Sequence, residues 1–233
     1  MTDSELALAY APILHMDAAE TIPLRAVGYT IFRTAAQSAS FPKRRIEPEL
    51  GGLVIEYAFY FDYDVEHMYD LEHIWVFLGP DGDLRDAQGS YHGKYLNLLL
   101  PDFPGALLPE NGHVQAFCQP GKHAFLASGD MTRLYPGWDR CCTQAGGPVL
   151  IGNPFEAAWS PSGKDLFVPT DRDNQNSIRW LREHLSFTPS LRFLRQPPVP
   201  ADHFLPWPAL FEKIPVWIAR ECQRLSELYA KEE

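Results

Sequence analysis

Two strand-like segments flank a short, strongly charged loop near the middle of the chain, and this arrangement limits the possible fold. Residues 53–62 (LVIEYAFYFD) are rich in β-branched and aromatic residues, and residues 72–78 alternate between two faces. Both patterns are typical of β-strands. Gly-Pro-Asp-Gly at 79–82 is a strong turn signal, so residues 84–89 are expected to form the returning arm of a hairpin.

Short segments punctuated by Gly and Pro continue the β pattern, including residues 114–118 and 123–126 on either side of a Gln-Pro-Gly-Lys turn. The predicted fold class is therefore mainly β, an antiparallel β-sandwich. Residues 174–184 and 208–231 have apolar side chains at helical spacing. They predict C-terminal α-helices packed on the sandwich, with the longer helix broken or kinked at Pro215.

The chain is expected to form a single domain over residues 1–233, a length that can bury a sizeable core. Residues 1–170 are assigned to the sandwich with the candidate metal site. Residues 171–233 are assigned to a helical extension, which includes a proline-rich strap at 195–208.

The amino-acid composition limits the classes of partner that we expect for this chain. The chain has 30 acidic and 20 basic residues, a formal charge of −10, which argues against nucleic acid or an anionic membrane as partner. No segment has the length of a bilayer-spanning helix, and the N-terminus lacks the positive charge of a secretory signal. A cytoplasmic protein with no integral membrane part is expected, and the oligomeric state stays open. Free thiols are expected for all four cysteines: Cys118, Cys141, Cys142 and Cys222.

The densest chemistry lies in residues 64–73. Six carboxylate or imidazole side chains fall within these ten positions: Asp64, Glu66, His67, Asp70, Glu72 and His73. Carboxylates held so close together repel one another, and a bound cation is a common remedy, since oxygen and imidazole ligands suit hard or borderline divalent metals. The plainer alternative is a solvated acidic loop.

The strand period adds a geometric expectation. Residues two apart share a face, so Asp70 and Glu72 project together, at the end of the apolar face that continues through residues 74–78, while His73 points the other way. An uncompensated charge on such a face is costly. With Asp64 and His67 from the loop, these carboxylates predict a four-residue site for Mg²⁺, Ca²⁺, Mn²⁺ or Fe²⁺ rather than a structural zinc site.

Two further histidines lie next to or near glycine in the sequence. His92 precedes Gly93, and His123 follows Gly121 and Lys122. Glycine lets backbone approach a ligand closely, and histidine titrates near neutral pH. His92 and His123 are therefore the candidate acid or base residues, although an isolated histidine is more often structural.

Taken in order, these pieces resemble the necrosis- and ethylene-inducing peptide-like (NLP) proteins and the vacuolar-sorting-related sequences that share a D-x-E strand. The resemblance covers about residues 10–126. The matching motifs are Tyr10-Ala-Pro-Ile-Leu, Tyr60-Phe-Asp-Tyr-Asp64, His67-x-x-Asp70-x-Glu72, Ser90-x-His92-Gly-x-Tyr95 and Gly112-His113 followed by Gly121-x-His123-Ala.

The resemblance implies a β-sandwich that holds a divalent cation in an acidic cavity. Asp64, His67, Asp70 and Glu72 match the family's metal ligands. His123 matches a histidine near the cation, and His92 lies in a motif that lines the same cavity.

The chain departs from the plant-toxic members, which read G-H-R-H-D-W-E where this chain reads E-H-M-Y-D-L-E at 66–72. Tyr69 and Leu71 replace the second histidine and the tryptophan. From the resemblance we expect this chain to share the fold and the cation site of the family, but not its cytolytic activity.

Three functions remain open from the sequence. The first is a divalent-metal-binding sandwich that recognises a small polar ligand, a sugar or a phosphorylated group, in an acidic cavity. The second is a metal-dependent hydrolase with His123 or His92 as general acid or base. The third is a structural cation site on a protein whose partner surface lies elsewhere.

Overall fold

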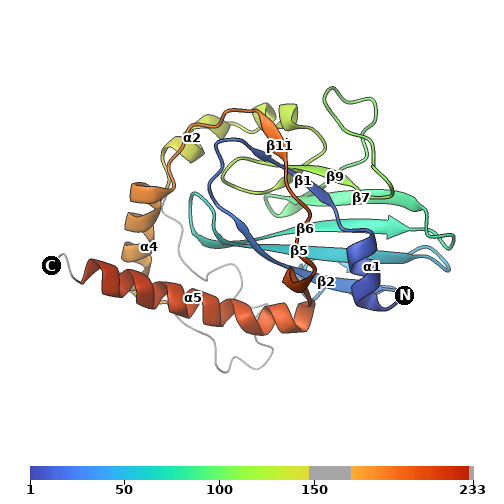
Figure 1. Cartoon of the computed structure of the whole chain (residues 1–233), viewed down its shortest axis with the longest axis horizontal. Helices are drawn as coiled ribbons and strands as arrows, with labels where there is room; N and C mark the ends of the chain where they lie inside the picture. Colours follow the sequence, from blue (N-terminus) through green and yellow to red (C-terminus); the bar gives the residue numbers. More distant parts are fainter. Residues whose placement is uncertain (147–168, 231–233) are drawn as a thin grey trace.

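The computed structural model describes residues 1–146 and 169–230, in which two β-sheets pack together and the C-terminal helices lie along one side (Figure 1). The larger sheet has the strand order β12–β2–β5–β6–β7–β8, and the smaller has the order β10–β9–β1–β11. The larger sheet consists of β2 (Leu24–Phe32), β5 (Leu53–Tyr63), β6 (Met68–Leu78), β7 (Leu84–Tyr91), β8 (Lys94–Asn97) and β12 (Phe204–Pro206). The smaller consists of β1 (Ile13–Asp17), β9 (Gln115–Cys118), β10 (Phe125–Leu126) and β11 (Phe193–Arg195).

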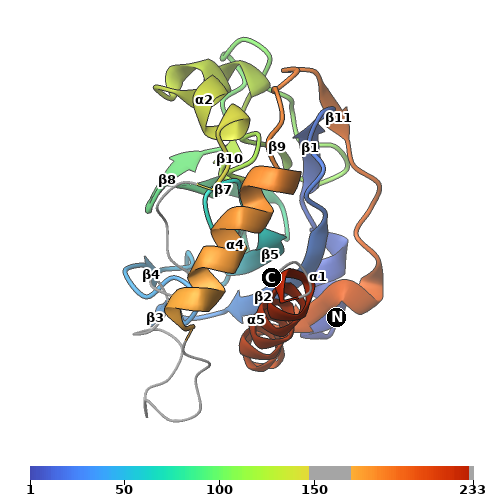
Figure 2. The same cartoon turned by 90° about the vertical axis from the view of Figure 1, so that its left-hand side faces the viewer.

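The remaining elements lie around these sheets. Strands β3 (Ala36–Gln37) and β4 (Arg45–Ile46) form a separate ribbon. In the described part of the chain, the α-helices are α1 (Asp3–Ala9), α2 (Trp138–Thr143), α4 (Asp171–His184) and α5 (Trp207–Tyr229), and 3₁₀ segments span Gly129–Leu134 and Ala201–His203. Figure 2 shows α4 crossing near α5 at one side of the sheets.

Strands β5 and β6 place the acidic residues between the two sheets. Their antiparallel register sets Phe61 opposite Asp70 and Phe59 opposite Glu72. The Phe59 ring packs edge-on against Phe125 of the smaller sheet, with centroids 5.0 Å apart. The face that carries Asp70 and Glu72 is therefore the inner face, as the alternation in the sequence predicts.

The outer face of the same strands packs against a different segment, the one between β3 and β4. His73 stacks on Trp75, and Phe41 packs against both rings from the segment between β3 and β4. His73 thus points away from the acidic face, in agreement with the strand period.

Helix α5 covers another part of the large sheet. A Cβ at Gly28 of β2 would lie 2.8 Å from Cδ2 of Leu210, so glycine permits this close approach. The helix is assigned as continuous through Pro215, not as two pieces. Apolar residues on both sides of the proline, Leu210, Ile214 and Ile218, are buried against the core and stabilise both halves.

The mainly β sandwich with C-terminal helices is thus confirmed. Among the described strands, the pairing is antiparallel except for β1 with β9 and β12 with β2. The C-terminal segment supplies strands as well as helices, since β11 joins the smaller sheet and β12 the larger. Residues 147–168 of the predicted sandwich portion lie outside the described residues. Within residues 1–146 and 169–230, no helix is long and apolar enough to cross a membrane.

Candidate metal centre

The loop between β5 and β6 is organised by Asp64. One carboxylate oxygen of Asp64 accepts hydrogen bonds from the backbone N–H groups of Glu66, at 2.5 Å, and His67, at 2.7 Å. This is a local turn of the kind that aspartate favours. The Val65 N–H also donates to the Gly121 carbonyl, at 2.9 Å, which ties the loop to the turn between β9 and β10.

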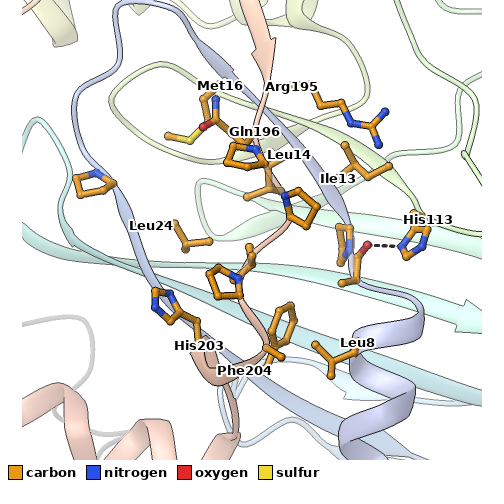
Figure 3. A pocket seen from close by; sticks show the side chains of 18 of the residues that line it. Leu8, Ile13, Leu14, Met16, Leu24, His113, Arg195, Gln196, His203 and Phe204 are labelled. Carbon is orange, nitrogen blue, oxygen red and sulfur yellow. Dashed lines mark hydrogen bonds between the residues drawn. The ribbon is translucent and has the colours of Figure 1, made fainter.

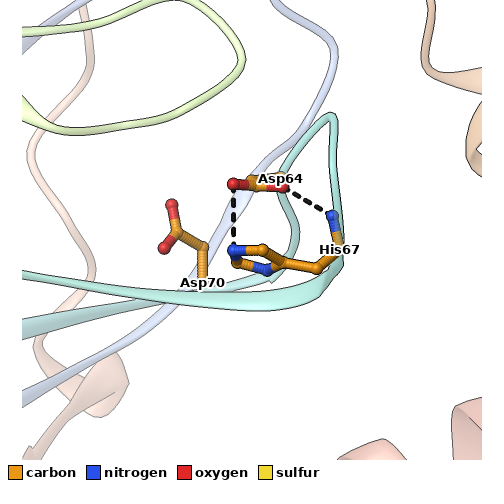
Figure 4. Close-up of side chains that lie close together, drawn as sticks. All are labelled: Asp64, His67 and Asp70. Atoms are coloured by element: carbon orange, nitrogen blue, oxygen red, sulfur yellow. Dashed lines mark hydrogen bonds and ion pairs between the residues drawn. The ribbon is translucent and has the colours of Figure 1, made fainter. Parts of the chain in front are cut away.

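Asp64, His67 and Asp70 form a group that can hold a metal ion. Each offers one ligand atom, and these atoms all lie within 4.8 Å of one another (Figure 4). His67 Nε2 lies 3.2 Å from Asp64 Oδ2. His67 Nδ1 lies 2.5 Å from the Tyr69 carbonyl, which can only accept, so Nδ1 carries the proton. Nε2 is therefore free to act as a ligand, as in many metal sites.

Lys122 supplies a positive charge inside this acidic group. Its ammonium donates to Asp64 Oδ2 and to Glu66 Oε2, the latter at 2.8 Å. Burial opposes the charged form, but the two carboxylates outweigh it and raise the pKa of Lys122. Sequence reasoning named the Gly-Lys-His segment for its histidine and missed the lysine.

His123 pairs with Asp70 in the interior. Its Nδ1 lies 3.0 Å from Asp70 Oδ2, and its ring stacks on Phe61 with centroids 3.9 Å apart. Burial disfavours the imidazolium, but the Asp70 hydrogen bond and the charge of Glu20 outweigh it, so the pKa of His123 is raised. Asp70 is also buried, yet its bond to His123 lowers the pKa of that carboxyl.

Glu72 lies apart from the group of three. It projects from the same face of β6, but one of its oxygens accepts from the Ser90 hydroxyl, which in turn accepts from the His73 N–H at 2.6 Å. Burial and the charge of Asp70 raise the pKa of Glu72 well above its ordinary value. Its role as a fourth ligand stays a prediction.

His92 lies at the exposed side of the site. Its Nε2 is 2.7 Å from the side-chain oxygen of Gln119, and its ring stacks on Tyr135 with centroids 4.5 Å apart. The predicted site residues therefore fall in one region, with Asp64, His67 and Asp70 together, His123 behind Asp70, and His92 at the rim.

Strained backbone surrounds these residues. Tyr69, His92 and His123 have φ angles of 55°, 47° and 54°, in the left-handed region that residues other than glycine rarely adopt. Such conformations cost roughly 1–3 kcal/mol each and tend to gather at functional sites.

A separate cavity of about 780 Å³ is lined by residues of β1, the β1–β2 connection and the segment that leads from β11 to β12 (Figure 3). Its walls include Leu14 and Met16 of β1 and Phe204 of β12. Glu20 also lines it, and Glu20 Oε2 accepts from the Gly121 N–H at 2.6 Å. The cavity therefore adjoins the turn that carries Lys122 and His123, but it does not contain the group of three ligands.

Comparison with known proteins gives a likeness in structure. No protein-family model and no curated protein sequence matches the chain. The solved structure "NLPPya in complex with mannosamine" is 16% identical, covering 55% of this chain and 69% of that one, with a TM-score of 0.36. "Toxin fold as basis for microbial attack and plant defense" is 16% identical over 55% and 70%, with a TM-score of 0.34.

A crystal structure of NLPPya with three substitutions is likewise 16% identical, over 80% of this chain and 91% of that one, with a TM-score of 0.38. These solved structures include NLP proteins, the family that the motifs of the sequence resemble. The likeness to vacuolar-sorting-related sequences stays a prediction.

Proposed function

We propose that this chain binds a divalent cation, Mg²⁺, Ca²⁺, Mn²⁺ or Fe²⁺, through Asp64, His67 and Asp70. The bound ion then holds a small polar ligand, a sugar or a phosphorylated group. The observation that carries the proposal is the approach of three ligand atoms to within 4.8 Å of one another on a buried, hydrogen-bonded loop.

The donor set suits these ions. Two carboxylates and one imidazole are the mixed hard and borderline ligands that such metals take, and the site holds no thiolate that would favour zinc. Three protein ligands leave coordination positions for water or for ligand oxygens, because these ions take about six or more donors.

The ligand would approach from the side of Glu66, His67 and His92. The side chains of His67 and Glu66 are 20% and 37% exposed, whereas that of Asp64 is 1% exposed. His92 is also exposed, and its ring lies near enough to Glu66 for the charge of each group to affect the other. A polar ligand on the ion would meet the Glu66 carboxylate and the His92 ring. Because His92 Nε2 donates to the Gln119 side-chain oxygen, Nδ1 of the neutral ring is an acceptor, so both groups can accept from ligand hydroxyls.

Metal content is the first test. Purified protein is dialysed against Mn²⁺ or Ca²⁺, and bound metal is measured by elemental analysis and titration calorimetry. His67→Gln and Asp70→Asn should each lose binding, while the control Asp102→Asn, at an exposed position, should keep it. Equal binding by all four proteins, or none by the unaltered chain, would refute the site.

Ligand recognition is tested with the metal present. Monosaccharides and sugar phosphates are titrated into the metal-loaded protein and into protein treated with chelator. Affinity that appears only with the metal supports the proposal. Stabilisation by the metal with no ligand and no turnover would instead assign the ion a structural role and leave function to a partner surface.

One observation favours a metal-dependent hydrolase as the second candidate. His123 is oriented by Asp70, and its Nε2 has no hydrogen-bond partner among the described residues. A histidine that is oriented by a carboxylate through one nitrogen can act as a general acid or base through the other. Its side chain has no solvent exposure, however, so a substrate would reach it only through the ion or a water.

The His123→Gln variant distinguishes the binding protein from the hydrolase. A hydrolase should lose turnover of phosphate or glycosyl esters with this variant while keeping metal affinity. A binding protein has no turnover to lose, and its ligand affinity should change less with His123→Gln than with His92→Ala at the exposed side.

A further inference from the structure

Two thiols outside the candidate metal centre lie against each other at helix α2. The Sγ atoms of Cys141 and Cys142 are 3.7 Å apart, and both cysteines are free. Successive side chains on an α-helix diverge by about 100°. Sulfurs at this separation therefore require both side chains to turn toward one another.

Neighbouring carbonyl groups hold the two thiols in this arrangement. Cys141 Sγ donates to the Trp138 carbonyl at 3.2 Å, and Cys142 Sγ donates to the Pro120 carbonyl at 3.2 Å. Cys142 is buried and Cys141 is partly exposed. A small reagent can therefore meet Cys141 first and find the second sulfur already beside it.

A direct disulfide fits this pair poorly. Adjacent residues on a trans peptide have Cα atoms about 3.8 Å apart, below the roughly 4.4–6.8 Å that disulfides span. The sulfurs would also have to close from 3.7 Å to about 2 Å. The pair is better placed to share a third atom than to bond to each other.

The spacing suits one central soft atom. A pyramidal trivalent centre with bonds to sulfur of about 2.3 Å and an angle of about 100° places its two sulfurs about 3.5 Å apart, close to the 3.7 Å found here. Thiolates select soft ions over hard ones. A trivalent metalloid needs only two protein sulfurs, because its third position is filled by its own substituent.

We propose that Cys141 and Cys142 form a dithiol site for a trivalent metalloid, arsenic(III) or antimony(III), bound through both sulfurs. With an aryl arsenoxide, two As–S bonds form and the arsenic–oxygen bond breaks. Both thiol protons leave with that oxygen as one water, and no atom is oxidised or reduced.

Electrostatics near the pair agrees with this chemistry. The pKa of Cys141 is lowered, because the Cys142 thiol can donate its one hydrogen to the Cys141 sulfur in place of the Pro120 carbonyl. Burial opposes this effect, and the charge of Lys122 adds to it. The partly exposed sulfur is therefore the better nucleophile, since the thiolate is the reactive form.

Phenylarsine oxide is the probe, and the readout is intact-protein mass with a competition titration on metal-free, reduced protein. One arsenical should bind per chain, resist excess monothiol and leave with a dithiol. Cys141→Ser should weaken binding by about 100-fold or more, the loss typical when one of two linked contacts is removed. Cys118→Ser and Cys222→Ser are the matched controls, because both thiols are buried elsewhere.

Cys141→Ser is the deciding variant, since Cys142→Ser alters a buried position. A double variant, Cys118→Ser with Cys222→Ser, retains only the adjacent pair and should still bind one arsenical. The proposal is overturned if the unaltered protein takes up no arsenical, if the adduct leaves with monothiol, or if Cys141→Ser binds as tightly as the unaltered chain.

Discussion

Lys122 donates a hydrogen bond from its ammonium group to the buried carboxylate of Asp64, beside the ligands predicted for a divalent cation. The protein thus provides part of the positive charge that its acidic loop needs. The same carboxylate oxygen faces His67 Nε2 at 3.2 Å. A divalent ion on Asp64 would meet the lysine charge at short range, so the lysine and the ion should compete.

Replacing Lys122 should reveal this competition. We expect Lys122→Met to bind Mn²⁺ or Ca²⁺ at least ~10-fold more tightly, equivalent to ~1.4 kcal/mol, because a repelling charge is gone. Without metal, the variant should be less stable by roughly 3–5 kcal/mol, since Asp64 is left as a buried, uncompensated charge. Calorimetric titration and thermal unfolding measure the two effects.

The exposed Lys94→Met is the control for Lys122→Met. Lys94→Met should change neither the metal affinity nor the stability of the metal-free protein. If Lys122→Met binds the ion no more tightly than the unaltered protein, the lysine and the metal do not compete for Asp64.

Glu72 offers a test of the ligand set. Because its carboxylate accepts from Ser90 and lies outside the group of three, Glu72→Gln should leave metal affinity within ~2-fold, a change below ~0.5 kcal/mol. The raised pKa of Glu72 means that the folded state disfavours its charge. Stability is therefore lost as pH rises above the ordinary carboxyl range toward that raised pKa.

Metal-free Glu72→Gln should accordingly melt higher than the unaltered protein at pH 8, with the difference shrinking at pH 4. Thermal melts at both pH values and a metal titration measure these effects. A loss of metal binding comparable to that of Asp70→Asn would make Glu72 a ligand after all.

The strand pattern predicted a good part of this site. Alternation along residues 70–78 places Asp70 and Glu72 inward and His73 outward, because the period of two is local. The sequence grouped Asp64, His67, Asp70 and Glu72 around the short loop between two strands, and the first three offer ligand atoms within 4.8 Å of one another. These inferences needed only neighbouring residues.

Long-range partners could not be predicted in the same way. Lys122 lies far along the chain from Asp64, and only the packing of the β9–β10 turn on the 64–67 loop brings them together. The parallel pairing of β12 with β2 likewise depends on the path of the C-terminal segment. Nothing in the local pattern of either segment encodes these contacts.

Gly28 tests the packing of α5 on the sheet. A Cβ there would lie 2.8 Å from Leu210 Cδ2 and 3.1 Å from Trp207 Cε3, so Gly28→Val should cost about 1–3 kcal/mol through overpacking. Chemical denaturation measures the loss. Leu210→Ala in the same chain should recover part of it, because residues in contact are energetically coupled. Purely additive effects of the two substitutions would contradict this contact.

His73 should make the protein sensitive to mild acid. Burial, with the charge of Arg44 adding to it, lowers the pKa of His73 to about 3. The folded state therefore keeps His73 neutral while the unfolded state takes up a proton below about pH 6.5. Its contribution to stability is complete above that pH and is lost as pH falls toward 3. From pH 7 to pH 5 this amounts to about 2 kcal/mol, at 1.36 kcal/mol per pKa unit.

His73→Phe isolates that contribution and keeps an aromatic ring beside Trp75, whose centroid lies 5.5 Å from that of His73. Asp70, Glu56 and Glu72 also titrate in this region, so the measured quantity is the difference in unfolding free energy between variant and unaltered protein at each pH. The unfolding free energy of the variant, relative to that of the unaltered protein, should rise by about 2 kcal/mol when the pH falls from 7 to 5. A difference that stays constant between these pH values would mean that His73 takes up its proton equally well in the folded state.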